Sequence, residues 1–76
     1  MDLQRLRYFL AVARSGRFTA AARQQHVTQP TVSSAIAELE QELGVRLFHR
    51  GRRVELTLEG RTLVDYAVQI EDLLDE

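Results

Sequence analysis

The feature that most restricts the fold of this 76-residue chain is the short connection between two segments with helical patterns. Residues 18–25 contain three consecutive alanines, which leave a smooth surface for another helix, and residues 29–43 repeat apolar side chains at helical spacing. Only His26, Val27 and Thr28 join the two segments. So short a link can connect two helices only at a sharp angle, and the sequence therefore predicts a helix-turn-helix.

The second helix of this pair, at residues 29–43, has an apolar face and an opposite face of small or polar residues. Thr28 is a natural N-cap, Pro30 suits the first turn, and Gly44 suits the left-handed residue that ends a helix. We expect the apolar face to pack on the rest of the domain. It consists of Val32, Ala35, Ile36, Leu39 and Leu43, and the opposite face includes Pro30, Ser34, Ala37 and Gln41.

Two helices are predicted before this one. Residues 3–14 have helical apolar spacing, with Asp2 as a natural N-cap and Gly16 where a C-terminal left-handed residue is expected. The helix at residues 18–25 is expected to use Thr19 as its N-cap and to end near Gln25.

The stretch RLFHRGRRVELT predicts two short strands around a glycine turn, because Val54 and Leu56 alternate with Glu55. Thr57 then suits the N-cap of a last helix. We therefore predict a mainly α fold: a winged helix-turn-helix of three helices plus a two-stranded wing in residues 1–57, followed by a long dimerisation helix in residues 58–76. No stop signal follows this helix, so we expect a truncated linker helix and a longer parent protein.

Composition excludes several classes of site. There is no cysteine, and His26 and His49 have no ligand-spaced partners, so we expect no disulfide, metal or cofactor. The chain has no Ser, His and Asp set and no glycine-rich phosphate loop, so we expect no enzyme. No apolar run approaches the ~20 residues of a membrane span and no signal peptide pattern is present, which predicts an intracellular protein without membrane contact.

The net charge of −1 conceals an uneven distribution. Residues 1–53 contain nine arginines against four acids, a net charge of +5, and residues 54–76 contain one arginine against seven acids, a net charge of −6. Residues 1–53 are therefore basic, and residues 54–76 are acidic. All ten basic residues are arginine, which suits phosphate recognition but is better explained by the codon bias of a genome.

The polar start of the helix at residues 29–43 is the first candidate for DNA contact. In a helix-turn-helix the N-terminal part of the second helix enters the major groove, where Gln, Ser and Thr can hydrogen-bond to base edges and apolar groups can contact a thymine methyl. Helix capping alone explains Thr28 and Pro30 equally well, but an exposed pair of serines inside a helix is unfavourable unless it has a partner. We therefore predict base contacts from Gln29, Pro30, Thr31, Ser33 and Ser34.

Arginines supply the second set of candidates. Arg50, Arg52 and Arg53 surround Gly51 and repel one another unless an anion is present, which favours contact with phosphates or the minor groove over a merely solvated tip. Arginines on one face of an amphipathic helix usually only form its solvent-exposed side. Among those, Arg17 and Arg23 beside the second helix are the best candidates for contact with the DNA backbone.

The last predicted helix repeats apolar residues in the manner of a heptad seam. This seam either folds back onto its own domain or pairs with the same helix of another chain. Because its apolar surface exceeds what one small body can cover, we favour a homodimer, which presents two reading helices about one DNA turn (~34 Å) apart. The predicted dimer interface consists of Leu63, Tyr66, Ala67, Ile70, Leu73 and Leu74.

Three segments together, LRYFLAVARSGRFTAAA, HVTQPTVSSAIAELEQELGVRLFHR and VELTLEG, resemble the N-terminal DNA-binding domain of LysR-type transcriptional regulators, from residue 3 to about residue 60. The resemblance implies a linker helix that dimerises and a C-terminal effector-binding domain that is absent here. It also implies dimers or tetramers on an interrupted palindrome of double-stranded DNA, in the bacterial cytoplasm at the nucleoid, with small-molecule effectors that bind only the absent domain. Carried over to this sequence, Thr19 and Thr28 lie where the family's helix-start hydroxyls approach phosphate.

The sequence departs from the family pattern at three places. Gln25 stands where leucine is usual, and the turn between Arg50 and Val54 is a residue shorter than usual. Ser34, Ala37 and Glu38 occupy positions that are frequently basic, so we expect this chain to depend more on its wing. The alternative hypothesis is a winged-helix protein-interaction or dimerisation module without DNA binding, which the sequence pI of about 6.1 supports.

Overall fold

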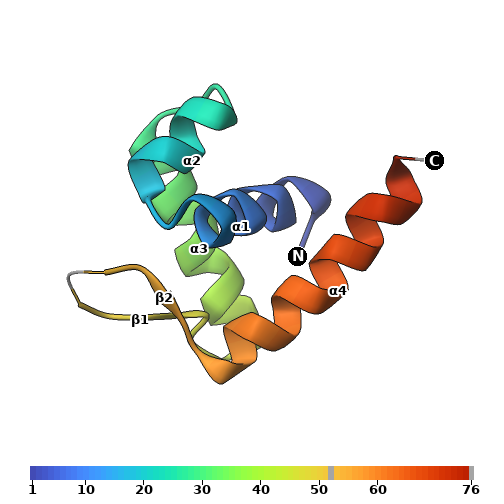
Figure 1. Cartoon of the computed structure of the whole chain (residues 1–76). Helices are drawn as coiled ribbons and strands as arrows, with labels where there is room; N and C mark the ends of the chain where they lie inside the picture. Colours follow the sequence, from blue (N-terminus) through green and yellow to red (C-terminus); the bar gives the residue numbers. More distant parts are fainter. Residues whose placement is uncertain (52, 76) are drawn as a thin grey trace.

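The order of elements confirms the predicted winged helix-turn-helix followed by a long helix (Figure 1). This computed structural model describes residues 1–51 and 53–75, so the predicted roles of Arg52 lie outside the described residues. The elements are α1 (Leu3–Ser15), α2 (Phe18–Gln24), α3 (Gln29–Leu43), β1 (Phe48–His49), β2 (Glu55–Leu56) and α4 (Leu58–Leu74). The two strands are antiparallel, with Phe48 opposite Leu56 and His49 opposite Glu55.

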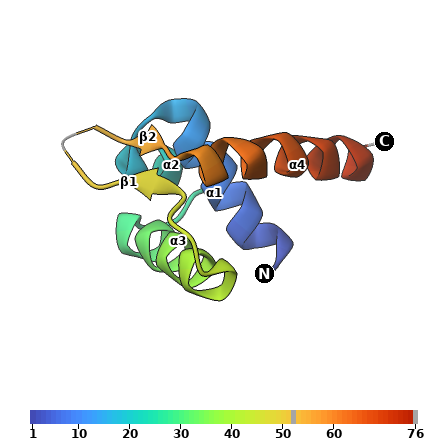
Figure 2. The ribbon, with the colours of Figure 1, turned by 90° about the horizontal axis from the view of Figure 1, so that it is seen from below.

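The first three helices pack together, and α1 lies between α3 and α4 (Figure 2). The hairpin leaves this body on one side, while α4 runs past α1 and away from the wing. The largest fully buried side chains come from α1, α3 and the start of the hairpin, so the core joins all three. They are Phe9, Leu10, Val12, Val32, Leu39 and Leu47.

Helix boundaries follow the capping residues in the sequence. Thr28 accepts a hydrogen bond from the backbone N–H of Thr31, and Gly44 has the left-handed φ of 71° that ends α3, as predicted. Asp2, Gly16 and Thr57 also cap their helices as predicted. The turn between α2 and α3 depends on His26, which adopts a left-handed φ of 58°.

The predicted N-cap of α2 is wrong. Arg17 is the N-cap residue, with an extended φ of −147° and no capping hydrogen bond from its side chain, and Thr19 lies within the first turn. The N-cap lies two residues before Thr19 because the Phe18 ring belongs to the helix and packs edge-on against Phe48, with ring centroids 6.0 Å apart. Tertiary packing therefore sets the start of this short helix in place of a hydroxyl cap.

One face of α4 packs on α1. Ala67 is 2 % exposed and contacts Leu6 and Leu10, and Leu63, Val64 and Val68 surround this contact. An ion pair between Arg14 Nη1 and Glu71 Oε1, at 3.1 Å, continues the contact toward the C-terminal end of α4. Among the described residues, no helix has the length and apolar character needed to cross a bilayer.

The junction between the wing and α4 allows no side chain at Gly60. A Cβ atom there would lie 2.1 Å from the carbonyl oxygen of Leu47, so Gly60→Ala must move one backbone segment. We expect it to lower the free energy of unfolding by about 1–3 kcal/mol, as overpacking does. Gly51→Ala is the matched control, because nothing lies within 4 Å of its added Cβ. Urea unfolding measures both, and equal stability of the two variants would contradict the close approach.

Candidate nucleic-acid interface

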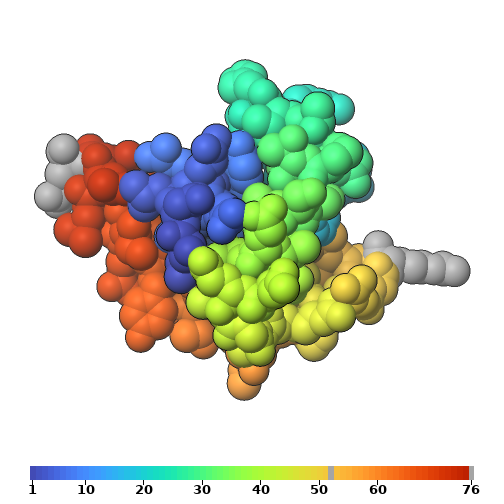
Figure 3. Space-filling view, turned by 180° about the vertical axis from the view of Figure 1, so that it is seen from behind, coloured from blue at the N-terminus to red at the C-terminus, as the bar shows by residue number. Residues whose placement is uncertain are grey.

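The N-terminal half of α3 forms an exposed ridge. Val32, Ile36 and Leu39 are buried against the body, which fixes the helix and turns its other face outward. Seen from behind, α3 stands between α1 and the hairpin (Figure 3). All five predicted base-contact residues are exposed on this ridge: Gln29, Pro30, Thr31, Ser33 and Ser34.

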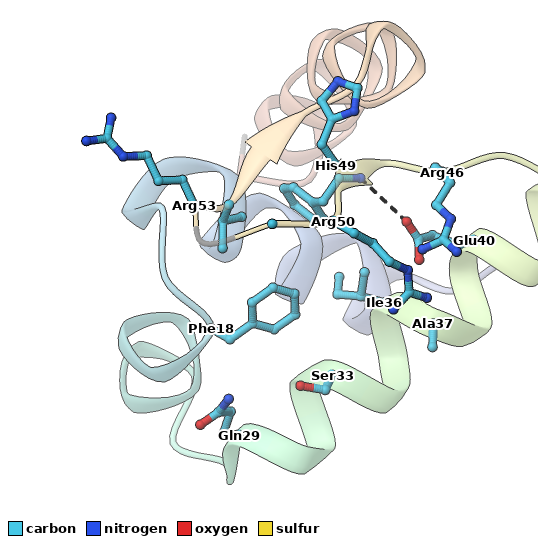
Figure 4. A pocket seen from close by; sticks show the side chains of 13 residues that line it. Phe18, Gln29, Ser33, Ile36, Ala37, Glu40, Arg46, His49, Arg50 and Arg53 are labelled. Carbon is cyan, nitrogen blue, oxygen red and sulfur yellow. Dashed lines mark hydrogen bonds between the residues drawn. The ribbon is translucent and has the colours of Figure 1, made fainter.

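The ridge divides these five residues between two flanks. Gln29 and Ser33 line a groove of about 420 Å³ between α3 and the hairpin, here called the wing groove, which also contains Phe18, Arg50 and Arg53 (Figure 4). Pro30, Thr31 and Ser34 line a second groove, which lies between α3 and α1. The candidate surface is therefore a ridge with a groove on each side, as an element that inserts into a nucleic-acid groove requires.

The side chains of the wing point in different directions. Arg50 reaches back across the wing groove toward Ala37 and Glu40, whereas Arg53 points away from it (Figure 4). Gln29 and Arg53 also line a groove with Arg17 and Thr19 at the start of α2. Of the predicted backbone contacts, Arg17, Thr19 and Arg53 are thus gathered around the start of α3. Arg50 lies over the C-terminal half of α3, and Arg23 lies in the last turn of α2.

Acids on α3 are each engaged by a cation or by backbone N–H groups. Glu38 forms an ion pair with Arg5 of α1, and Glu42 pairs with the N-terminal amine. Glu40 accepts a hydrogen bond from the backbone N–H of Leu47, at 2.8 Å. The sequence pattern placed Arg5 only on the solvent face and gave no sign of its pair with Glu38. It did offer one sign of an ion pair, because Arg5 lies three residues after Asp2, and its Nε is 3.8 Å from the Asp2 carboxylate.

The predicted dimer residues of α4 fall into two groups. Leu63 and Ala67 pack on α1 of their own chain, so the structure places Ala67 in the core of the domain, where it has almost no surface for another chain. This corrects the prediction for Ala67, because the small side chain lets α4 approach Leu6 and Leu10 closely. The other four are exposed, with exposed fractions of 61 % for Tyr66, 37 % for Ile70, 70 % for Leu73 and 50 % for Leu74.

Together, a helix-turn-helix and a two-stranded hairpin beside the second helix define a winged helix-turn-helix protein. Residues 3–61 match the family model of bacterial regulatory helix-turn-helix proteins of the lysR family, and the chain belongs to this family.

Two similar proteins are described as HTH-type transcriptional regulators. An uncharacterized HTH-type transcriptional regulator in the ibpB-leuC intergenic region of Azotobacter vinelandii is 51 % identical over 100 % of this chain and 54 % of its own length. The HTH-type transcriptional regulator ClcR of Pseudomonas putida is 50 % identical over 88 % of this chain and 23 % of its own length. The chain therefore spans about half of the first relative and about a quarter of the second.

Solved structures with the same fold include complexes with DNA. The crystal structure of the CbnR_DBD–DNA complex has a TM-score of 0.93 and 39 % identity, covering 99 % of this chain and 87 % of that chain. The BenM_DBD/benA site 1 DNA complex has a TM-score of 0.95 and 42 % identity, covering 99 % of this chain and 85 % of that chain.

The start of α3 depends on the hydroxyl of Thr28. Its Oγ1 accepts from the Thr31 N–H at 3.3 Å and shares a hydrogen bond with Thr31 Oγ1 at 2.8 Å. We expect Thr28→Val to lower the free energy of unfolding by about 1 kcal/mol, the usual effect of losing an N-cap. Thr28→Ser keeps the capping hydroxyl and is expected to keep most of that stability. Thermal unfolding measures both, and an unchanged Thr28→Val variant would show that the cap does not stabilise α3.

Proposed function

We propose that this chain binds double-stranded DNA sequence-specifically, as the DNA-binding domain of a bacterial transcriptional regulator. The observation that carries the proposal is the exposed polar ridge of α3, which stands beside an arginine-bearing wing and is fixed from behind by its apolar face. The DNA complexes of similar chains at about 40 % identity support the same function. A protein-interaction module without DNA binding leaves this ridge unexplained.

In the proposed complex the N-terminal half of α3 enters the major groove. Gln29 addresses an adenine through both of its amide atoms, and Ser33 and Ser34 donate to or accept from neighbouring base edges. The Pro30 ring and the Thr31 methyl contact a thymine methyl. Because no acid lies in the first turn of α3, its backbone N–H groups present a positive helix end to the DNA.

Contacts with the DNA backbone position this helix without reading sequence. Arg17 and Thr19, together with Thr28, flank the start of α3 and face adjacent phosphates in the proposed complex. The wing follows the backbone or the neighbouring minor groove. Its contacts are Arg50, Arg52 and Arg53, and Arg23 adds a further one from α2.

We infer a homodimer through α4. Tyr66 and Leu73 are 61 % and 70 % exposed on the side of α4 that does not contact α1, and a second copy of the helix covers them. Ile70 and Leu74 lie at the edge of this surface, in a groove that they line with Leu6 and Leu10 of α1, and Leu63 packs on α1. Two-fold symmetry then presents two copies of α3 about one DNA turn (~34 Å) apart, which suits an interrupted palindrome.

The regulatory part of the protein lies beyond these 76 residues in the proposal. A small-molecule effector binds a C-terminal domain, and full-length chains form dimers or tetramers on DNA. The protein acts in the bacterial cytoplasm at the nucleoid. It has no catalytic activity and needs no metal or cofactor.

Two substitutions test the division between base reading and phosphate contact. We expect Gln29→Ala to relax preference at one base pair by about 1–3 kcal/mol, and Arg53→Ala to weaken all sequences alike and to reduce the salt slope by about 1. Fluorescence anisotropy on a duplex selected from a random pool, and on single-base changes of it, measures both. If the two variants lose affinity equally on every sequence, the proposed roles are wrong.

The dimer surface is tested by an acidic substitution on the exposed side of α4. We expect Leu73→Glu to shift the chain from dimer to monomer in sedimentation velocity, because the charge has to be buried unpaired in the interface. Leu58→Glu is the control, since Leu58 is exposed to a similar degree at the other end of the same helix, 77 % against 70 %. A Leu73→Glu variant that sediments like the unchanged chain contradicts the interface.

A further inference from the structure

The backbone at the start of the wing is held from the side of α3. Glu40 lies in the C-terminal half of α3, and its Oε2 accepts from the N–H of Leu47 at 2.8 Å and, more weakly, from that of Phe48 at 3.5 Å. Hydrogen bonds to a carboxylate are about twice as strong as those between neutral groups. Leu47 and Phe48 are buried and Glu40 is half-buried, so water competes less for these bonds than at an exposed site.

The same backbone is held from the side of α4. The Thr57 N–H donates to the carbonyl oxygen of Leu47 at 3.0 Å, and its hydroxyl donates to that of Arg46 at 2.5 Å. Gly60 lets α4 lie directly on the Leu47 carbonyl. One short segment, Arg46–Phe48, is therefore fixed between the last turns of α3 and the first turn of α4.

The direction of the wing is set at this segment. At the end of this segment the ring of Phe48 contacts the rings of Phe9 and Phe18, with centroids 5.4 and 6.0 Å away, and Arg50 follows two residues later. Glu40 thus links the helix that carries the base-contact residues to strand β1, which leads into the arginine-bearing turn of the wing. Figure 4 shows its hydrogen bond to the strand beside the wing groove.

We propose that Glu40 is a positioning residue for DNA binding. Its carboxylate holds the wing at a fixed distance from the start of α3, so that Arg50 and Arg53 meet phosphates while Gln29 meets a base. The inference rests on the proposed function. Fixing two contact surfaces before binding removes the ordering penalty that a mobile wing would add to association.

The sign of the effect distinguishes positioning from simple electrostatics. A carboxylate next to a DNA-binding surface repels phosphates, so its removal by itself strengthens binding. Positioning predicts the opposite for Glu40, because the loss of the carboxylate frees the wing. Glu42 offers a matched control on the same helix, since it is exposed and pairs with the N-terminal amine, remote from the wing.

The experiment compares Glu40→Gln, Glu42→Gln and the unchanged chain on a duplex selected from a random pool, by fluorescence anisotropy over a range of salt concentrations. We expect Glu40→Gln to weaken binding about eightfold for each chain of the dimer at 0.1 M salt and to lower the log–log slope by about 0.9 for each chain, the effect of losing one phosphate contact per chain. The base preference associated with Gln29 stays unchanged. Glu42→Gln binds as tightly as the unchanged chain or more tightly.

The inference is overturned if Glu40→Gln binds DNA as tightly as the unchanged chain. It is also overturned if the variant binds more weakly with an unchanged salt slope, and the loss of affinity matches the unfolded fraction seen by circular dichroism. If Glu40→Gln does not fold, Glu40→Asp takes its place. The shorter carboxylate keeps the charge but cannot reach both N–H groups, so the same loss of slope is expected, and an unchanged slope overturns the inference. Failure of the proposed function has a different signature, namely no salt-dependent binding by the unchanged chain.

Discussion

The architecture depends on the buried entry of the wing into the helical core. Leu47 and Phe48 belong to the hairpin, yet they are buried among α1, α2 and α3. A two-stranded hairpin is marginally stable by itself, so its position has to come from packing elsewhere. The Phe48 ring between Phe9 and Phe18 supplies that packing, and hydrogen bonds from both α3 and α4 fix the backbone beside it. The base of the wing, α3 and the start of α4 consequently form one packed unit.

This packing explains how α3 can contact DNA although the exposed N-terminal half of the helix carries no basic side chain. The buried face of α3 turns Gln29 and Ser33 outward, while arginines from the wing and from the start of α2 surround them. Glu38 and Glu42 are paired with cations, which reduces their repulsion of phosphates. The net charge of −1 is a poor guide, because most acids lie in the C-terminal segment, away from the ridge.

Local signals in the sequence predicted most of the fold. The bounds of α3 were predictable because Thr28, Pro30 and Gly44 specify its two ends, and Asp2, Gly16 and Thr57 did the same elsewhere. What the sequence did not reveal depends on contacts between distant elements. No periodic pattern in the sequence indicates that Glu40 accepts from the Leu47 N–H or that Arg5 pairs with Glu38. The burial of Ala67 depends on how α4 packs on α1. The same kind of contact placed the N-cap of α2 at Arg17 instead of Thr19.

The central claim is that the ridge of α3 and the arginine wing bind one duplex together. The most direct test is the affinity of the dimer for a selected duplex as a function of salt concentration. Five arginines per chain, three from the wing with Arg17 and Arg23, predict a steep log–log slope of about −9 for the dimer, at about −0.9 for each phosphate contact. A flat salt dependence, or equal affinity for the selected duplex and for one with scrambled half-sites, would contradict the account.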